Sequence, residues 1–374
     1  MKTKVIIKEQ RQYILSEIVI ALHEIFTELH IFEKLKDTKR VLLKPNLLGA
    51  HTPDKAVTTH PVVLEAVIKI LKNLDKEIIV GDSPGGTVKA SHVWKMTGIA
   101  EVCIRHDVRL IDFGKEGVVN VKTNIAKFFI DKNVLECDAI INIAKMKTHS
   151  LMLYTGAVKN LYGTIPGLYK TELHKDFPTP NDFAPILSSI YGIVKSNIIL
   201  NIIDGIVGME GEGPAAGTPY PFGILIASEK ASAADYAATQ MMGFDFNNIH
   251  YLKQSLSEDN ILVAEIDINK KYKNFKYPGV QINKVIFRYN LLNKIPNFLI
   301  NAFKGIFSFY PAFKNECEMC MLCVQSCPAF AIEKNKNKLS LKKNKCIKCL
   351  CCHELCPISA IYLKKSMLAR FVLK

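Results

Sequence analysis

The sequence predicts an α/β domain, with a mostly parallel sheet and helices on both faces, followed by a small cysteine-rich α+β domain. Three observations lead to this prediction. Apolar runs of strand length recur through roughly the first 270 residues, helix-like segments lie between them, and nine of the eleven cysteines fall between Cys317 and Cys356. At 374 residues the chain is long enough for two domains.

Strands that are covered on both faces of a parallel sheet read as unbroken apolar runs. Five segments have this character: Val41–Lys44, Ile78–Val80, Ala139–Ile143, Ile198–Ile203 and Phe222–Ala227. Helices are expected between them at Pro61–Asn73, which Thr59 and a first-turn proline open, and at the alanine-rich segment Ser232–Met242. This alternation predicts the α/β class but not the order of the strands.

The composition is that of a folded soluble protein, with 49% hydrophobic and 22% charged residues. The N-terminal sequence MKTKVIIKEQ has no signal-peptide character, so we expect a cytoplasmic location. Cysteines crowded into one stretch of a non-secreted protein indicate metal ligation rather than disulfides. The net charge of +14 fits an acidic partner, an anionic substrate, a membrane surface or nucleic acid, and selects none of them.

The predicted boundaries divide the chain into an α/β domain (1–285), an amphipathic connecting helix (286–313) and a cysteine-rich domain (314–374). In the connecting helix Asn297, Asn301, Lys304 and Ser308 form a narrow polar stripe beside a wide apolar face. Packing between the two domains, peripheral contact with a membrane and docking of a partner all fit such a helix.

Two cysteine runs form an internal repeat in the C-terminal domain. They are Cys317-x-x-Cys320-x-x-Cys323-x-x-x-Cys327-Pro328 and Cys346-x-x-Cys349-x-x-Cys352-x-x-x-Cys356-Pro357. In this spacing three thiolates bind one [4Fe–4S] cube, and the cysteine before proline reaches the neighbouring cube. We therefore predict two [4Fe–4S] clusters, one on Cys317, Cys320, Cys323 and Cys356, the other on Cys346, Cys349, Cys352 and Cys327.

The segment from Lys314 to Leu363 resembles the bacterial two-cluster ferredoxin, which implies short strands packed over the clusters with pseudo-twofold symmetry. A zinc site is the competing interpretation, but it needs only four ligands per metal and no Cys-Pro closure. Cys351 does not fit the spacing and is expected to be a spare thiol or a packing residue, and His353 is expected at the surface. Cys103 and Cys137 stand in apolar contexts that predict small core residues.

Polar residues follow four of the predicted strands, where open α/β sheets place their ligands. The candidates are Lys44, Asp82, Lys145, Lys147, His149 and Asp204. If the sheet is parallel, these strand ends meet at one edge. Two lysines and a histidine suit an anionic small molecule or acid–base work, and a solvated basic edge is the alternative. Lys159 is a further candidate, although a surface position is the stronger expectation.

The turn Gly81-Asp-Ser-Pro-Gly85-Gly86 offers a possible anion site through the backbone N–H groups of Gly81, Ser83, Gly85 and Gly86. The turn lacks the lysine and the serine or threonine of a Walker A loop, and its glycines do not have the spacing of a dinucleotide fingerprint. A plain connection between strand and helix fits it equally well.

A set of motifs in fixed order extends this picture: Lys44-Pro-Asn46, Thr59-His60-Pro61, Gly81-Asp-Ser-Pro-Gly85, Lys145-Met-Lys-Thr-His149, Gly156-Ala-Val-Lys-Asn160 and Asp204-Gly205. Together they resemble the prokaryotic family DUF362, a domain of unknown function often followed by a ferredoxin. The resemblance spans most of Val41 to Asp235. It implies the architecture and, because the family has no generally assigned reaction, no particular chemistry.

These features favour an iron–sulfur oxidoreductase, in which the clusters relay electrons between a donor or acceptor protein and a substrate in the α/β domain. Lys44, Lys145, Lys147 and His149 would bind an anionic group or supply protons, with Asp82 or Asp204 orienting them. An electron-transfer or assembly protein without its own substrate is the first alternative, and a non-redox enzyme with structural clusters is the second. Nucleic-acid binding ranks last, because no helix–turn–helix, RNA-recognition or zinc-finger pattern is present.

Overall fold

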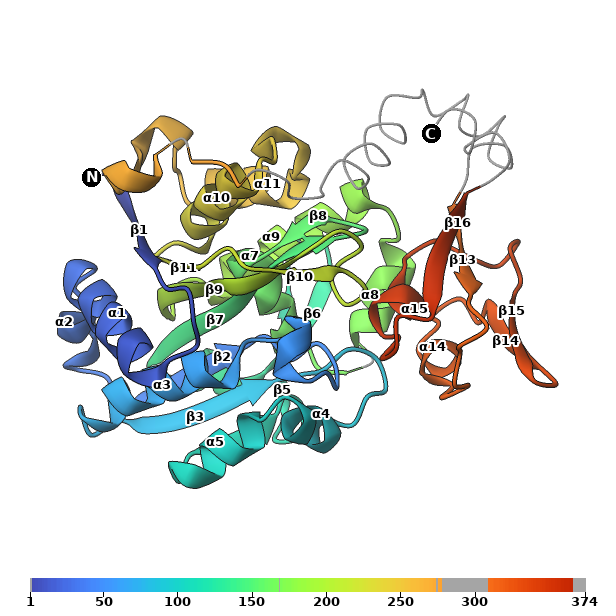
Figure 1. Cartoon of the computed structure of the whole chain (residues 1–374), viewed down its shortest axis with the longest axis horizontal. Helices are drawn as coiled ribbons and strands as arrows, with labels where there is room; N and C mark the ends of the chain where they lie inside the picture. The colour runs from blue at the N-terminus through green and yellow to red at the C-terminus, as the bar shows by residue number, and fades with distance from the viewer. Residues whose placement is uncertain (1, 168, 274, 278–308, 366–374) are drawn as a thin grey trace.

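The computed structural model describes residues 2–167, 169–273, 275–277 and 309–365. In this part of the chain, a ten-stranded sheet lies between two layers of helices, and a smaller domain stands beside one edge of the sheet (Figure 1). The α/β class predicted from the sequence is therefore confirmed.

The strand order across the sheet runs β12 (Ile266–Ile268), β1 (Thr3–Glu9), β11 (Ile224–Ser228), β9 (Ile198–Glu210), β7 (Ala139–His149), β2 (Arg40–Pro45), β3 (Glu77–Asp82) and β4 (Arg109–Asp112). Two short strands pair beside this path, β8 (Leu153–Thr155) with β7 and β10 (Thr218–Tyr220) with β9. The strands from β9 to β4 are parallel, so their carboxyl ends meet at one edge. All residues of β7 are buried, which explains why its first half, Ala139–Ile143, reads as an apolar run.

All five predicted strands are present, but the run Phe222–Ala227 differs from the expectation of a parallel strand. It forms β11, which is antiparallel to both β1 and β9. The connection from β9 first turns back through β10, which pairs antiparallel with β9 itself. No helix intervenes to carry the chain across the sheet, and so the next strand returns in the opposite direction.

Helices cover both faces of the sheet. One face is covered by α1 (Leu15–Glu28), α2 (Ile31–Leu35), α3 (Pro61–Lys72), α4 (Ala90–Met96) and α5 (Ile99–Arg105). The other is covered by α6 (Lys132–Glu136), α7 (Ala157–Asn160), α8 (Tyr169–Asp176), α9 (Pro180–Val194), α10 (Ala231–Met242) and α11 (His250–Glu258). The two predicted helices match α3 and α10 to within one residue. His60, rather than Thr59, is the N-cap of α3, and its side chain accepts a hydrogen bond from the backbone of Val62.

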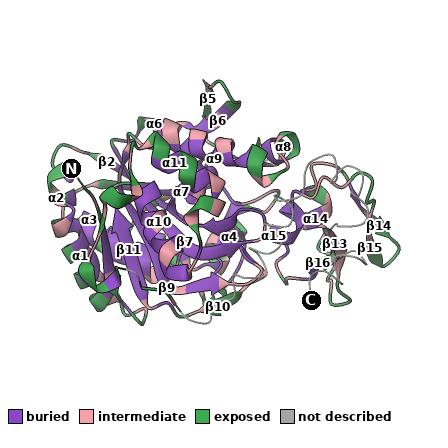
Figure 2. Ribbon diagram, turned by 90° about the horizontal axis from the view of Figure 1, so that it is seen from above, coloured by how far each residue is buried: buried purple, intermediate pink, exposed green. Residues whose placement is uncertain are grey.

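Shorter elements complete the α/β domain. They are the hairpin β5 (Val118–Lys122) and β6 (Lys127–Asp131) and the 3-10 helices η1 (Pro53–Lys55), η2 (Leu161–Thr164), η3 (Phe246–Asn248), η4 (Val263–Glu265) and η5 (Lys270–Tyr272). Figure 2 shows the central strands as buried, and strand β5 at the rim of the domain is largely exposed. Cys103 and Cys137 are buried in the core, as predicted.

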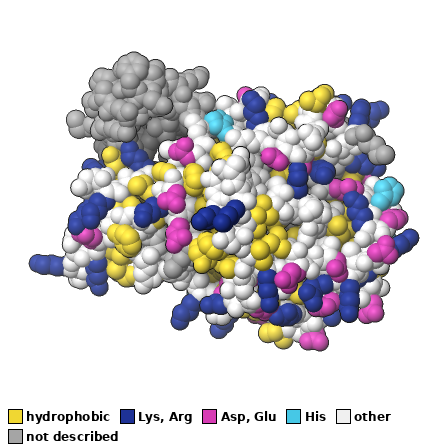
Figure 3. Space-filling model, turned by 180° about the vertical axis from the view of Figure 1, so that it is seen from behind, with side chains coloured by type: hydrophobic (Ala, Val, Ile, Leu, Met, Phe, Trp, Pro, Cys, Tyr) yellow, Lys and Arg dark blue, Asp and Glu magenta, His cyan; other side chains and the backbone are white. Residues whose placement is uncertain are grey.

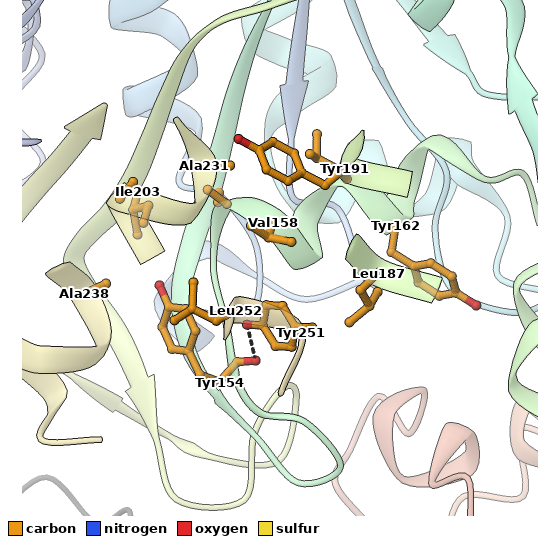
Figure 4. Packing of buried hydrophobic residues seen from close by; sticks show 14 of the residues in the cluster. Tyr154, Val158, Tyr162, Leu187, Tyr191, Ile203, Ala231, Ala238, Tyr251 and Leu252 are labelled. Carbon is orange, nitrogen blue, oxygen red and sulfur yellow. Dashed lines mark hydrogen bonds between the residues drawn. The ribbon is translucent and has the colours of Figure 1, made fainter. Parts of the chain in front are cut away.

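Tyrosines pack around the short helix α7, as Figure 4 shows. Tyr154, Tyr191 and Tyr251 are almost fully buried, and the Tyr251 hydroxyl donates to the backbone oxygen of Tyr154 at 2.9 Å. Asp235 of α10 accepts hydrogen bonds from the backbone N–H groups of Ala157 and Val158 at 2.6 and 2.9 Å. A helix this short depends on such contacts, which fix the position of its next residues.

The cysteine-rich domain has two antiparallel pairs of strands, β13 (Phe309–Phe313) with β16 (Ile361–Lys365) and β14 (Ile332–Asn335) with β15 (Lys338–Leu341). Its helices α14 (Leu322–Gln325) and α15 (Cys351–Glu354) occupy equivalent places in the two cysteine runs. Left-handed backbone conformations recur at equivalent non-glycine positions: Met319, Met321 and Phe330 in the first run, and Lys348, Leu350 and Ser359 in the second. The repeat in the sequence is therefore also a repeat in the backbone.

The predicted connecting helix (286–313) lies outside the described residues, except for its last five. Those five form strand β13 and not a helix, because they pair with β16 across the cysteine-rich domain. That domain therefore includes residues from Phe309 onward. Among the residues that the structure describes, no helix is long and apolar enough to cross a membrane.

Candidate functional site

The eight cysteines of the two runs surround two separate cavities. The first cysteine set, around a cavity of about 360 Å³, consists of Cys317, Cys320, Cys323 and Cys356. The second cysteine set, around a cavity of about 320 Å³, consists of Cys327, Cys346, Cys349 and Cys352. Each set takes three cysteines from one run and its fourth from the other, in the grouping that the spacing predicts.

The cysteine before proline is held in the same way in both runs. The backbone N–H of Ala331 donates to Cys327 Sγ at 3.3 Å, and the N–H of Ala360 donates to Cys356 Sγ at 3.1 Å. In the described part of the chain, no three His, Cys, Asp or Glu side chains come together closely enough to hold a single metal ion. The cysteines therefore stand around the cavities rather than meeting at one point.

A third cavity, which is partly open, lies between the α/β domain and the cysteine-rich domain. We call it the junction cavity. The α/β domain contributes residues from the carboxyl ends of β2 and β3, from α7 and η2, and from α8. The cysteine-rich domain contributes helix α15. The polar side chains that line it include Asn46, Asp82, Lys159, Asn160, Lys170, His174, Cys351 and Glu354.

The glycine-rich turn after β3 forms part of the domain contact. A Cβ atom on Gly86, whose φ is +59°, would lie 2.4 Å from Ser326 Oγ, and one on Gly85 would lie 2.5 Å from Leu355 Cδ2. The N–H of Gly85 donates to the Leu48 oxygen at 3.0 Å. These glycines allow the cysteine-rich domain to approach the backbone closely. Gly81 lies inside β3, where Phe113 would obstruct a side chain.

The ammonium group of Lys170 also contacts this turn, through its backbone carbonyl groups. Lys170 of α8 donates to the backbone oxygens of Ser83 and Pro84, and the Ser83 hydroxyl accepts from the N–H of Gly167 at 2.9 Å. The turn thus presents carbonyl oxygens to a buried cation. Burial lowers the pKa of Lys170 to about 7.

Lys44 and Asp82 form a buried ion pair at the wall of the junction cavity. Lys44 Nζ lies 2.7 Å from Asp82 Oδ1, and Asp82 Oδ2 accepts from the backbone N–H of Leu47 at 2.7 Å. A Cβ atom on Gly163 would lie 2.1 Å from Asp82 Oδ1, so only glycine fits beside the pair. Burial lowers the pKa of Lys44, and the charge of Asp82 opposes that shift.

Lys147 lies behind this wall and begins a chain of buried amides. Its Nζ donates to Val57 O at 2.6 Å and to Asn46 Oδ1 at 3.0 Å. Asn46 in turn donates to Asn160 at 3.0 Å, and Asn160 donates to Asn142 at 2.8 Å. Burial, followed by the charges of Lys159 and Lys145, lowers the pKa of Lys147 to about 7.

His149 reaches the cysteine-rich domain. Its Nδ1 accepts from the backbone N–H groups of Leu151 and Met152, both at 3.1 Å, and its Nε2 lies 3.3 Å from Glu354 Oε1. Complete burial is the main reason that the pKa of His149 falls well below its usual value, and Lys159 and Lys147 add to the effect.

Lys145 and Asp204 form a separate cluster away from the junction cavity. Lys145 Nζ donates to Asp204 Oδ2 at 2.8 Å and to the Tyr13 hydroxyl at 2.9 Å. The His60 ring stacks on Tyr13 with a centroid distance of 3.5 Å. The single edge cluster expected from the sequence is thus divided in two, because neighbouring strand ends are occupied by different internal partners.

Several lining residues were not among the sequence candidates. Lys170, His174, Cys351 and Glu354 line the junction cavity, and Lys159 joins them instead of standing at the surface. The motif Gly156–Asn160 carried a signal for Lys159, but α8 has no pattern that distinguishes Lys170 from an ordinary surface lysine. His353, expected at the surface, is only 2% exposed because α15 packs against the α/β domain.

The chain belongs to the family described as "Domain of unknown function (DUF362)", whose model matches residues 41–240. The family resemblance predicted for the α/β domain is thereby confirmed, and the match ends before the cysteine-rich domain. The matched region contains the β2, β3, β7 and α7 residues that line or support the junction cavity.

Two similar proteins extend the comparison. The thylakoid-associated protein sll1697 of Synechocystis sp. (strain ATCC 27184 / PCC 6803 / Kazusa) is 30% identical over 213 residues, which are 56% of this chain and 65% of that protein. The lactate racemase apoprotein from Thermoanaerobacterium thermosaccharolyticum has a TM-score of 0.40 and 12% identity, over 62% of this chain and 56% of that one. A likeness at this TM-score carries no argument about function.

Proposed function

We propose that this protein binds two [4Fe–4S] clusters and is a redox enzyme that transfers electrons between them and a small molecule in the junction cavity. One observation carries the proposal: Cys351 lines both the junction cavity and the cavity of the second cysteine set. The two cavities are therefore separated by little more than one side chain. Such proximity suits electron transfer from a cluster to a bound substrate.

The residues present fit this cofactor. Each cavity offers four thiol ligands in an apolar lining, and a backbone N–H points at one sulfur of each set. Hydrogen bonds to sulfur and burial are the features that proteins use to tune such clusters, which supply one-electron transfer when bound. A four-iron cube needs its ligands around a cavity, whereas zinc needs them within reach of one point.

The exposure of the cysteines gives the proposed relay a direction. Cys320 of the first set is exposed, whereas the four cysteines of the second set are buried or half-buried. An external electron donor or acceptor protein would approach the first set, and the second set would face the substrate. On the face shown in Figure 3, basic and acidic side chains are interspersed over the α/β domain.

The residues predicted from the sequence take different roles in this proposal. Lys44 and Asp82 hold the cavity wall, Lys147 orients Asn46, and His149 contacts Glu354. Lys145 and Asp204 stabilise the strand ends from a second, separate cluster. A protein that only carries electrons has no need for a cavity of this kind, and therefore the enzyme is preferred over the electron-transfer, assembly and structural-cluster alternatives.

Anaerobic quantitation of iron and sulfide, with EPR spectra before and after dithionite, tests the proposal. We expect roughly eight irons per chain and reducible, mutually interacting signals. Full loading without reduction would leave the clusters structural and favour non-redox chemistry. About four irons or fewer, after reconstitution, would refute the two-cluster assignment.

A further inference from the structure

Lys159, which is half-buried, differs from the buried lysines around the junction cavity. Lys44 is paired with Asp82, Lys147 donates to Asn46 and Val57, and Lys170 donates to the turn carbonyls. Across the described residues, the Lys159 ammonium has no hydrogen bond and no ion pair, and it lies over the Tyr162 ring at 5.9 Å from the centroid. Burial lowers its pKa, and Glu354 across the cavity is the main group that opposes this shift.

The charges around the cavity do not balance. Four lysines (44, 147, 159 and 170) stand at or directly behind its walls, against the two carboxylates Asp82 and Glu354. Burial lowers the pKa of Lys147 and Lys170 to about 7, so each loses part of its positive charge near neutral pH and the excess is reduced only in part. A bound anion would restore the balance at the place where Lys159 has no partner.

Two buried polar atoms at the cavity have no hydrogen-bond partner among the described residues. His174 is 5% exposed, its ring is held by stacking on Phe183 at 4.2 Å, and within the described chain its Nδ1 has no hydrogen-bond partner. Glu354 Oε1 also makes no hydrogen bond among the described residues, although His149 Nε2 lies 3.3 Å from it. Orphaned groups of this kind are rare in proteins and indicate an interaction that a ligand or water completes.

From these observations we infer that the junction cavity binds a small molecule through an oxyanion, a carboxylate or a phosphate group, which is held by the ammonium of Lys159. The accessible space of about 80 Å³ suits an anion of a few heavy atoms. Lys159 is fixed for this role by the Asp235 contacts to the start of α7. The inference rests on the proposal that this cavity is the substrate site, and it assigns the chemical class of that substrate.

Calorimetric titration of the anaerobic holoprotein with orthophosphate, acetate and succinate tests the inference. We expect saturable binding of at least one of these anions, with one site per chain, and the responding probe distinguishes phosphate from carboxylate. Replacing Lys159→Met should weaken that binding about ten- to hundredfold, the worth of one charged hydrogen bond. Lys159→Arg, which keeps the charge, should bind more tightly than Lys159→Met.

Lys253→Met, at an exposed position of α11, is the matched control and should bind as the wild type does. Saturable binding by none of the three anions, or equal binding by Lys159→Met and wild type, would overturn the inference. Iron content and EPR spectra of the same samples separate the two proposals. Full, reducible clusters without anion binding leave the redox function standing and remove only the oxyanion site.

Discussion

Lys44 and Asp82 show how one buried charge depends on another in this molecule. Their side chains are 1% and 4% exposed, and the pair is the direct support for the backbone at Leu47. Removing one partner leaves the other charge buried and uncompensated, which costs far more than the loss of an exposed pair.

We therefore expect Lys44→Met to reduce the free energy of unfolding by about 3–5 kcal/mol. The matched control is Arg40→Met in the same strand, whose pair with Glu77 is largely exposed and should contribute no more than about 1 kcal/mol. Denaturant unfolding measures both. Equal losses in the two variants would contradict the importance assigned to the buried pair.

The lowered pKa of Lys147 predicts a pH dependence of stability. Its folded pKa of about 7 lies below the ordinary value of 10.5, so between these values the unfolded chain binds more protons than the folded one. Stability from this group therefore rises with pH above about 7 and levels off near 10.5, by no more than about 1.4 kcal/mol per pH unit.

In Lys147→Met this contribution should disappear, so the stability difference between wild type and variant should shift in favour of the wild type as the pH rises from 7 to 9. Chemical unfolding across that pH range gives the measurement. Lys253→Met, at an exposed position of α11, provides the comparison for a lysine removed from the surface. A difference that is also constant for Lys147→Met would mean that Lys147 titrates normally.

At the scale of elements, short segments hold the junction together. Helix α7 has only four residues, yet it carries Lys159 and Asn160, and the turn after β3 receives the cysteine-rich domain. Neither segment is stable by itself, and both depend on contacts from elements that are distant in the sequence.

Asp235→Ala should destabilise the protein by about 1–3 kcal/mol, because it leaves the buried N–H groups of Ala157 and Val158 without acceptors. Asp245→Ala is the control, since Asp245 caps η3 from an exposed position and should cost less. Thermal unfolding compares the two. A smaller loss for Asp235→Ala than for Asp245→Ala would contradict the support assigned to α7.

Gly86 and Gly211 illustrate two different reasons why a position in the chain is occupied by glycine. Both have positive φ, +59° and +75°, but a Cβ on Gly86 meets Ser326 whereas one on Gly211 meets nothing within 4 Å. We expect Gly86→Ala to lose about 1–3 kcal/mol more than Gly211→Ala, and to expose the cysteine-rich domain to protease more quickly. Similar losses and similar cleavage rates would show that the turn does not depend on the domain contact.

At the scale of the whole molecule, the two cysteine runs exchange their last cysteines. Cys356 belongs to the second run but lines the cavity of the first set, beside Cys317, Cys320 and Cys323. We therefore expect assembly of the proposed clusters to require both halves of the domain to fold together.

We predict that Cys356→Ala impairs the cluster of the first set, and Cys327→Ala that of the second, each lowering the iron content from about eight toward about four. Cys351→Ser and the core variant Cys103→Ala should keep full iron. Iron analysis and EPR spectra of the remaining cluster provide the readout. Loss of the cluster within the variant's own run would refute the crossed assignment.

The sequence predicted the strands best where one local property determines the structure. Val41–Lys44 and Ala139–Ile143 are apolar enough to be buried on both faces, so their strands could be recognised without any partner. Phe222–Ala227 was equally recognisable as a strand, but its antiparallel direction depends on the turn through β10. The division of the polar residues into the ion pairs Lys44–Asp82 and Lys145–Asp204 could not be predicted from the local sequence either, because each lysine pairs with an aspartate of another strand.

By itself the sequence determined the α/β class, the family motifs and the grouping of the eight cysteines, because these depend on composition and on short, fixed spacings. Only the tertiary structure decided which polar side chains share a cavity. It brings Lys159, Lys170 and His174 of one domain opposite Cys351 and Glu354 of the other, and it uses the glycines at 85 and 86 for close approach. The physical reason is that burial, charge pairing and steric fit at a domain contact depend on residues far apart in the chain.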